Sequence, residues 1–285
     1  RGLGDVYKRQ LNALHRPAPG ADLTALEEKT SPEWQRLKFD ELLAQQIALR
    51  LNRQRKADLT ARPIKPVLGK TVERLLKTLP YALTAAQRRV IKEINEDLSK
   101  VSPMNRLLQG DVGSGKTVVA TLAALRAVDA GFQVALMAPT EILARQHYAT
   151  VCKMLDGMDV KVAVLTGASK ARERRASLEG IASGEVDILI GTHALIEDRV
   201  QFSNLGFVVI DEQHRFGVEQ RAALVRKGEQ PHTLVMSATP IPRTLALLVY
   251  GDLDVSIIDE LPPGRQPVQT VCVDERYRAR LNAFI

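Results

Sequence analysis

Residues 107–117, Leu-Leu-Gln-Gly-Asp-Val-Gly-Ser-Gly-Lys-Thr, have the residue types and spacing of a phosphate-binding loop. In the pattern G-x-x-x-x-G-K-[ST], the glycines let backbone N–H groups converge on phosphate oxygens, and the following helix adds its positive N-terminal end. Lys116 would then bind the β- and γ-phosphates, and the hydroxyl of Thr117 would bind the Mg²⁺ that accompanies a nucleotide. The predicted nucleotide-binding residues of this loop are Gly110, Asp111, Val112, Gly113, Ser114, Gly115, Lys116 and Thr117.

Two acidic residues at the end of an apolar run supply the second part of this chemistry. Asp211 and Glu212 directly follow the run from Gly206 to Ile210. In a phosphate-loop protein the first acid is placed to hold Mg²⁺ through water, and the second to polarise the attacking water. Such a pair is also common as a simple loop start or helix cap. Because a kinase needs no residue that activates water, the pair favours hydrolysis, and the predicted catalytic residues are Lys116, Asp211 and Glu212.

Short apolar runs alternate with helical patterns from Leu83 onward, and they indicate the elements that must position these residues. Strands are expected at 104–108, 133–138, 160–165, 186–190, 207–210 and 233–236, and helices at 90–98, 118–130, 141–155 and 169–182. Short buried strands between helices are typical of an α/β fold with a parallel sheet covered on both faces. Ligands of such sheets bind at the carboxyl ends of the strands, where the predicted loop lies.

The sequence before this region predicts basic helices. Ser31-Pro32-Glu33 is a good helix start, and Phe39, Leu43, Ile47 and Leu51 then form one apolar stripe that we expect to pack against another element. The prolines of residues 62–66 break this helix, and a short amphipathic helix is expected at 72–79. Residues 1–30 show no periodic pattern and remain unassigned, and residues 1–10 join so poorly to the neighbouring sequence that they need not be native.

Positive charge is concentrated in the same region. Between Arg36 and Lys77 there are eleven Lys or Arg against four Asp or Glu, an excess that equals the formal net charge of +7 of the whole chain. Two interpretations are open, a solvated helix face and a contact with nucleic acid.

Composition narrows the class of protein. A length of 285 residues with 45% hydrophobic residues suggests one large or two modest domains with a real core. The two cysteines lie far apart, which fits a reducing compartment, and no apolar run approaches the ~20 residues of a membrane span. We therefore expect a soluble, cytoplasmic protein without a membrane partner. The histidines and cysteines show no metal-ligand spacing, so no structural metal is expected.

Several motifs, in order along the chain, resemble those of one family. Residues 211–221, Asp-Glu-Gln-His-Arg-Phe-Gly-Val-Glu-Gln-Arg, resemble the second motif of superfamily 2 helicases in its D-E-Q-H form, and their extension resembles the RecG family of branched-DNA helicases. Residues 83–87 are similar to the adenine-reading motif, 138–147 and 191–196 to two DNA-contact motifs, and 237–244 to the third motif. The resemblance covers residues 81 to about 273.

The resemblance implies a RecA-like lobe of an ATP-dependent DNA helicase or translocase that uses ATP and Mg²⁺. Branched or forked DNA would be its partner, in DNA repair and recombination. It implies nucleotide binding by Gln87 and His214. It implies DNA contacts by Pro139, Thr140, Gly191, Thr192 and His193. It implies coupling of nucleotide state to DNA grip by Gln213, Ser237, Ala238 and Thr239.

The chemistry of these residues leaves alternatives open. A glutamine can read an adenine edge with two hydrogen bonds, but Gln87 could also be an ordinary surface residue of a helix. Hydroxyls after strands can meet nucleic-acid phosphates, although isolated threonines such as Thr140 and Thr192 are often helix caps. Ser237 and Thr239 could relay a change at the γ-phosphate or form a simple turn. His214 could bond toward the γ-phosphate, bond toward Thr239, or only pack.

The resemblance also implies a division of the chain. Residues 31–80 correspond to a helical linker trailing the family's DNA-binding wedge, residues 81–265 to the ATP-binding lobe, and residues 266–285 to a hinge and the opening of a second lobe. The arginine-finger motif of that lobe has no counterpart in this sequence, so the chain resembles a fragment of such a helicase. We expect it to bind ATP but to hydrolyse it poorly. Two alternatives are a transcription-repair coupling translocase, which tends to have Glu where Gln213 stands, and a phosphate-loop ATPase or scaffold acting on protein partners.

Overall fold

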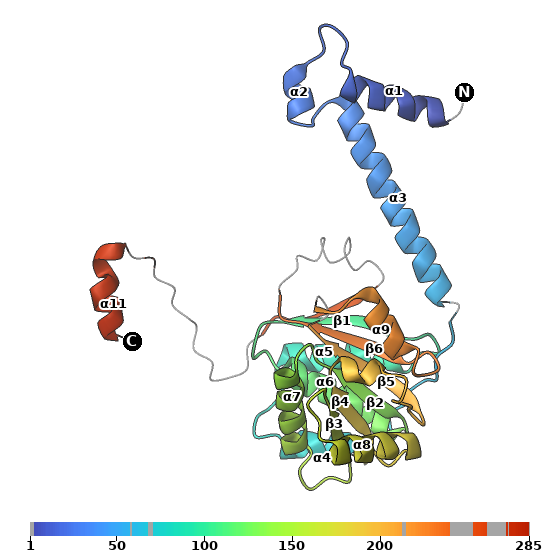
Figure 1. Cartoon of the computed structure of the whole chain (residues 1–285), viewed down its shortest axis with the longest axis vertical. Helices are drawn as coiled ribbons and strands as arrows, with labels where there is room; N and C mark the ends of the chain where they lie inside the picture. Colours follow the sequence, from blue (N-terminus) through green and yellow to red (C-terminus); the bar gives the residue numbers. More distant parts are fainter. Residues whose placement is uncertain are drawn as a thin grey trace.

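A single parallel sheet forms the centre of the molecule (Figure 1). The computed structural model describes residues 3–57, 59–67, 71–212, 215–239, 253–260, 272 and 274–284. Its seven strands lie in the order β3-β4-β2-β5-β6-β1-β7, and every neighbouring pair is parallel. The strands are β1 (Asn105–Gly110), β2 (Gln133–Met137), β3 (Val162–Leu165), β4 (Ile188–Gly191), β5 (Leu205–Asp211), β6 (His232–Ser237) and β7 (Asp254–Ile258). The predicted α/β fold with a parallel sheet is confirmed.

Helices cover both faces of the sheet. They are α4 (Thr71–Thr78), α5 (Ala85–Leu98), α6 (Lys116–Asp129), α7 (Glu141–Met154), α8 (Ala171–Ser183), the short 3-10 helix η1 (His193–Ile196) and α9 (Val218–Val225). The apolar core is divided by the sheet, since Phe207 and Val209 of β5 pack toward α5, α6 and α7, while Val208 and Ile210 pack toward α8, η1 and α9. This alternation is what a strand buried on both faces requires.

Helices α5 and α6 begin two or more residues earlier than the sequence indicated. Helix α5 begins at Ala85 because Thr84 and Gln87 form a capping box: the Gln87 N–H donates to Thr84 Oγ1 (3.1 Å), and the Thr84 N–H donates to Gln87 Oε1 (2.9 Å). Helix α6 begins at Lys116, directly after the loop, so the lysine and threonine of the motif lie in its first turn.

The N-terminal helices project away from the sheet in Figure 1. They are α1 (Leu3–His15), α2 (Leu23–Glu27) and α3 (Pro32–Ala57), and the first two lie where the sequence showed no pattern. The predicted start of α3 is confirmed, since the Trp34 N–H donates to Ser31 Oγ at 3.4 Å. The expected packing of its apolar stripe is wrong within the described residues, because Phe39, Leu43, Ile47 and Leu51 are each 45–55% exposed.

Residues 59–67 lie along the amino-terminal edge of the sheet and connect this region to it. The N–H groups of Ala61 and Ile64 donate to the carbonyls of Val101 (2.6 Å) and Leu98 (2.7 Å). The guanidinium of Arg126 donates twice to the Ile64 carbonyl, at 3.0 and 2.8 Å. Ala61 and Ile64 are buried, so the connection is part of the core and not a loose linker.

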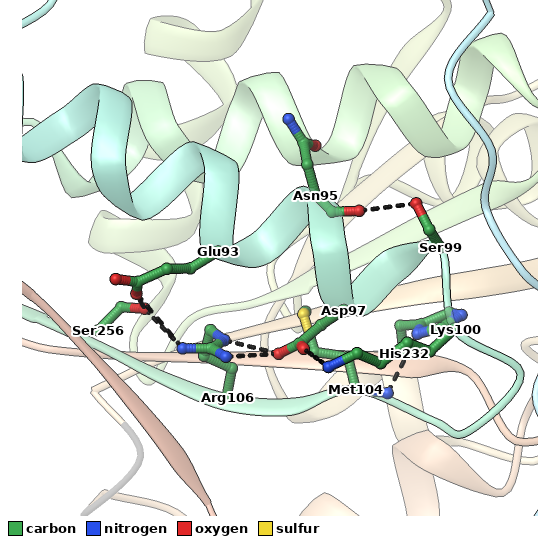
Figure 2. Close-up of polar contacts among 9 residues, drawn as sticks. All are labelled: Glu93, Asn95, Asp97, Ser99, Lys100, Met104, Arg106, His232 and Ser256. Carbon is green, nitrogen blue, oxygen red and sulfur yellow. Dashed lines mark hydrogen bonds and ion pairs between the residues drawn. The ribbon is translucent and has the colours of Figure 1, made fainter.

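A polar network joins α5 to strands β1 and β7 at this edge (Figure 2), and separate hydrogen bonds hold the start of β6. Arg106 of β1 donates to Asp97 of α5 at 2.6 and 2.8 Å and to Ser256 of β7 at 2.8 Å. His232, the first residue of β6, accepts the Met104 N–H at Nδ1 and donates from Nε2 to the Arg62 carbonyl, both at 3.1 Å. These two bonds require a neutral ring that carries its proton on Nε2.

Two further elements complete the described chain, η3 (Glu275–Tyr277) and α11 (Arg278–Phe284). Residues 266–271 and 273, which belong to the segment predicted as a hinge and the opening of a second lobe, lie outside the described residues. In the part of the chain that the structure describes, no helix combines the length and apolar character needed to cross a membrane.

The environment of His232 predicts a stability that depends on pH. Burial lowers the pKa of His232 below its ordinary value, so the folded protein resists a protonation that the unfolded chain accepts near pH 6.5. The contribution of neutral His232 to the free energy of unfolding should be complete above about pH 6.5. It should be lost as the pH falls from there toward the lowered pKa of the folded protein. Urea unfolding at pH 7.5 and pH 5.5 should show a smaller pH dependence for His232→Gln than for the unchanged chain. An equal dependence in the two proteins would contradict this role.

Candidate nucleotide-binding site

The predicted site residues converge because every strand is parallel. Neighbouring strands β4, β2, β5, β6 and β1 all end at one edge of the sheet. Along that edge lie, in order, Gly191 at the end of β4, Pro139 and Thr140 after β2, Asp211 at the end of β5, Ser237 at the end of β6, and the loop after β1. The predicted DNA-contact residues are therefore separated from the phosphate loop by the acid pair and the coupling residues.

Backbone conformations that favour glycine shape the loop between β1 and α6. Gly113 and Gly115 have φ values of +80° and +92°, a region that L side chains rarely adopt. A Cβ on Gly115 would also lie 2.2 Å from Nε2 of Gln87. The loop is closed by a bond from the Ser114 N–H to the Asp111 carbonyl at 3.1 Å. The backbone conformation at position 115 therefore favours glycine, and a side chain there would have to displace Gln87.

The Lys116 ammonium group lies within this loop. Its Nζ donates to the carbonyl oxygens of Gly110 (2.6 Å) and Asp111 (3.0 Å). Burial lowers the pKa of Lys116, and the nearby carboxylates of Asp211 and Glu212 act in the opposite direction. A cation held between a phosphate-type loop and two acids is suited to bind an anionic oxygen, which is a stronger acceptor than a carbonyl.

The two acids are held in different ways. Asp211 is 8% exposed, and its Oδ1 accepts the Glu212 N–H at 3.1 Å. Its Oδ2 lies 2.7 Å from Nε2 of His147, a residue of α7. Glu212 has a φ of +48°, and its Oε1 accepts the Ala238 N–H at 3.3 Å. The acid pair therefore contacts α7 on one side and the segment after β6 on the other.

Ser237, Ala238 and Thr239 lie between the acid pair and the end of β1. The hydroxyls of Ser237 and Thr239 are hydrogen-bonded at 2.8 Å, and Nε2 of Gln109 donates to the Thr239 carbonyl at 3.1 Å. These contacts place the segment where a change at the γ-phosphate could reach it, although the coupling role itself stays a prediction. Gln213 and His214, the other residues predicted here, lie outside the described residues, as do residues 240–244.

Gln87 is buried beside the phosphate loop. It is 1% exposed, and its Nε2 donates to the Ser114 carbonyl at 2.9 Å while its Oε1 accepts the Thr84 N–H. The alternative of an ordinary surface glutamine is therefore wrong. Adenine reading by Gln87 stays a prediction, and the contact with Ser114 shows a second role, support of the loop backbone.

The predicted DNA-contact residues differ in their accessibility. Thr140 is exposed and caps α7, since the Leu143 N–H donates to its Oγ1 at 3.3 Å. Gly191 is packed so closely that a Cβ would lie 2.2 Å from the Leu165 carbonyl oxygen. Thr192 is only 2% exposed, whereas the side chain of His193 is exposed. In this conformation Thr140 and His193 can reach a partner more readily than Thr192 can.

His147 is a site residue that sequence reasoning missed. Its partner Asp211 is 64 positions away in the chain, so the contact depends on the tertiary fold. A signal was nevertheless present, because Ala144, His147 and Val151 share one face of α7, and both apolar residues are buried. A polar side chain at a core-facing position of a helix usually has a specific polar partner.

The residues of the loop fit a magnesium nucleotide. Ser114 Oγ is buried and, within the described residues, has no hydrogen-bond partner, as expected of a group in a polar cradle. The half-buried Thr117 in the first turn of α6 and the carboxylate of Asp211 are both oxygen donors, which is the ligand type that Mg²⁺ prefers. Lys116 would supply the positive charge that a triphosphate requires.

Comparison with known proteins assigns the class. The model of the DEAD/DEAH box helicase family matches residues 84–248, which include the loop, the acid pair and the segment after β6. The chain belongs to the DEAD/DEAH box helicase family.

Within this family, the chain is similar to RecG helicases. It is 51% identical over 282 residues to the ATP-dependent DNA helicase RecG of Pasteurella multocida, covering 98% of this chain and 40% of that protein. It is 53% identical over 262 residues to the RecG of Aquifex aeolicus, covering 91% of this chain and 33% of the relative. The predicted resemblance to the RecG family is confirmed, and the chain spans less than half the length of these curated relatives.

Solved structures agree with this assignment. A structure described as RecG bound to a three-way DNA junction matches with a TM-score of 0.79 and 48% identity, covering 88% of this chain and 34% of that one. A DEAD box protein from Methanococcus jannaschii matches with a TM-score of 0.51 at 18% identity, which supports the RecA-like fold alone.

Substitution of Gly115 tests whether the loop binds nucleotide. Gly115→Ala should lower nucleotide affinity about tenfold or more, because a Cβ there displaces Gln87 and the N–H groups that converge on phosphate. Gly131→Ala is a matched control, since Gly131 has a similar φ of +84° but no atom within 4 Å of the added Cβ. Both variants should lose about 1 kcal/mol of stability from the backbone conformation. Titration with a fluorescent ATP analogue should separate them, and equal affinities would contradict the loop's role.

Proposed function

We propose that this chain is the ATP-binding lobe of an ATP-dependent DNA helicase or translocase that acts on branched DNA. The observation that carries the proposal is the placement of Lys116 after β1 and of Asp211 and Glu212 at the end of β5, at the same edge of the sheet and separated only by β6. ATP and Mg²⁺ are the cofactors that this arrangement fits.

Each residue has a distinct part in the proposed reaction. Lys116 exchanges the carbonyls of Gly110 and Asp111 for phosphate oxygens. Thr117 and Asp211 hold the nucleotide's Mg²⁺, which when bound neutralises charge on the phosphates. Glu212 accepts a proton from the attacking water, and its contact with the Ala238 N–H positions it for this.

Nucleotide selection and coupling involve residues around this centre. Gln87 selects adenine while supporting the loop through Ser114, and His214 contributes to binding at the γ-phosphate side. Ser237, Ala238 and Thr239, together with Gln213, transmit the nucleotide state. Their support is the chain of contacts from Glu212 through Ala238 and Thr239 to Gln109 of β1.

DNA is proposed to contact two parts of the chain. One is the end of β2 and β4, where the proposed contact residues are Pro139, Thr140, Gly191, Thr192 and His193. The other is the basic segment of residues 36–77, part of which forms the projecting helix α3. The RecG structure that this chain resembles is described as bound to a three-way DNA junction, which supports a branched substrate, with repair or recombination as its setting. A transcription-repair coupling translocase is not favoured by the relatives, which are RecG helicases.

Substitution of the acids tests the division of their roles. In a full-length parent that also contains the second lobe, Glu212→Gln should leave the affinity for MgATP unchanged but lower hydrolysis about 100-fold or more, the scale of a lost proton acceptor. Asp211→Asn should instead raise the Mg²⁺ concentration needed for nucleotide binding. Identical magnesium titrations for the two variants would refute the assignment.

Salt dependence tests the nature of the partner. Binding to a forked duplex should weaken at least about tenfold between 50 and 200 mM salt, because phosphate contacts release counterions, whereas an ATPase acting on protein partners should bind DNA poorly. Arg50→Gln, in the basic segment, should reduce the slope of log affinity against log salt by about 0.9. Arg175→Gln is the control, since Arg175 is exposed on α8 and paired with Glu179. An unchanged slope for Arg50→Gln would argue against contact through α3.

A further inference from the structure

We infer that His147 is a positioning residue for the metal-binding acid: its imidazole holds the carboxylate of Asp211 in the orientation that Mg²⁺ requires. The inference rests on the proposed function, because it assumes that Asp211 binds Mg²⁺. It adds a residue of α7, outside the phosphate loop and the acid pair, to the nucleotide site.

The contact between His147 and Asp211 has the geometry of a strong hydrogen bond. Nε2 of His147 lies 2.7 Å from Oδ2 of Asp211, and both side chains are only 11% exposed. A carboxylate can only accept, so the ring donates from Nε2. A hydrogen bond to an ionised group in such a sheltered place is stronger than one between neutral groups in water.

The bond from His147 completes the restraint of the Asp211 carboxylate. The other oxygen, Oδ1, accepts the N–H of Glu212 at 3.1 Å. With one oxygen fixed by the backbone and the other by the imidazole, the plane of the carboxylate cannot rotate freely. Mg²⁺ demands near-ideal octahedral geometry, so an acid that holds it directly or through water benefits from a fixed orientation.

The position of His147 on its helix favours this role over simple packing. Ala144 and Val151, on the same face of α7, are 0% and 2% exposed. An aliphatic side chain would fill such a position without the cost of burying a polar ring. Histidine is explained there by its bond to Asp211.

The same helix connects the acid to the predicted DNA-contact residue Thr140. Thr140 caps α7, and His147 lies about two turns further along, roughly 10 Å at 1.5 Å per residue. Glu141, the first residue of α7, also accepts the Ala168 N–H at 2.9 Å, which fixes the start of the helix to the segment after β3. His147 thus reaches the metal-binding acid from an element that is anchored at its DNA-facing end.

Magnesium titrations of matched variants test the inference. His147→Leu removes the donor at similar size, His147→Gln keeps an N–H donor of similar reach, and His147→Asn keeps an amide that is too short to reach Oδ2. His15→Leu, at an exposed position of α1, is the control for the replacement itself. The readout is the Mg²⁺ concentration that gives half-maximal binding of a fluorescent ATP analogue to the 285-residue chain, with affinity in EDTA measured alongside.

The expected pattern distinguishes positioning from packing. His147→Leu and His147→Asn should raise the half-maximal Mg²⁺ concentration about tenfold, the lower end of what a hydrogen bond to a charged group contributes. His147→Gln should stay within about threefold of the unchanged chain, and affinity in EDTA should stay the same in all. An unchanged requirement in His147→Leu, or equal requirements in His147→Gln and His147→Asn, would overturn the inference.

Asp211→Asn separates this inference from the function on which it rests. If Asp211→Asn leaves the magnesium requirement unchanged, the metal role of Asp211 is wrong and the inference falls with it. If Asp211→Asn raises the requirement and the His147 variants do not, only the inference is wrong. Should His147→Leu fail to fold by far-UV circular dichroism, the comparison of His147→Gln with His147→Asn decides the question alone.

Discussion

The parallel alignment of the strands is the constraint on which the site depends. Because β2, β5, β6 and β1 run in the same direction, the segments that leave their carboxyl ends meet at one edge, although they come from positions far apart in the sequence. Asp211 pairs in register with Met236, and Gln109 with Ser237, so the acid pair, the segment after β6 and the loop after β1 differ little in height along the strands. A shift of one residue between β5 and β6 would turn the side chains of a strand to the opposite face and separate these groups.

The two edges of the sheet differ in the polar contacts that they make. At the carboxyl edge, Lys116 donates to the carbonyls of Gly110 and Asp111, and Glu212 accepts the Ala238 N–H. At the amino edge, Arg106 and Asp97 belong to a network that joins α5 to β1 and β7 (Figure 2). His232 separately links β6 to Met104 and to the connection from the N-terminal helices. The contacts at the amino edge support the register of the strands, on which the proposed nucleotide site at the carboxyl edge depends.

Sequence reasoning reached most of the sheet and the order of the site residues because both depend on local patterns. It missed β7, where Ser256 interrupts the apolar run; that serine is buried because it bonds to Arg106, which is 150 positions away. It missed α1 and expected the stripe of α3 to be covered, since a periodic pattern shows which face is apolar and not what meets it. It also took Gln87 only for a base-reading or surface residue and overlooked His147, because their partners Ser114 and Asp211 become neighbours only in the folded chain.

We expect the loop of residues 110–117 to bind phosphate and Lys116 to contact a bound nucleotide. A crystal structure of this chain with a non-hydrolysable ATP analogue and Mg²⁺ tests it most directly. The triphosphate should lie in the loop, with Nζ of Lys116 moved from the carbonyls of Gly110 and Asp111 to phosphate oxygens and the Thr117 hydroxyl bound to the metal. A nucleotide bound elsewhere, with Lys116 still on both carbonyls, would contradict it.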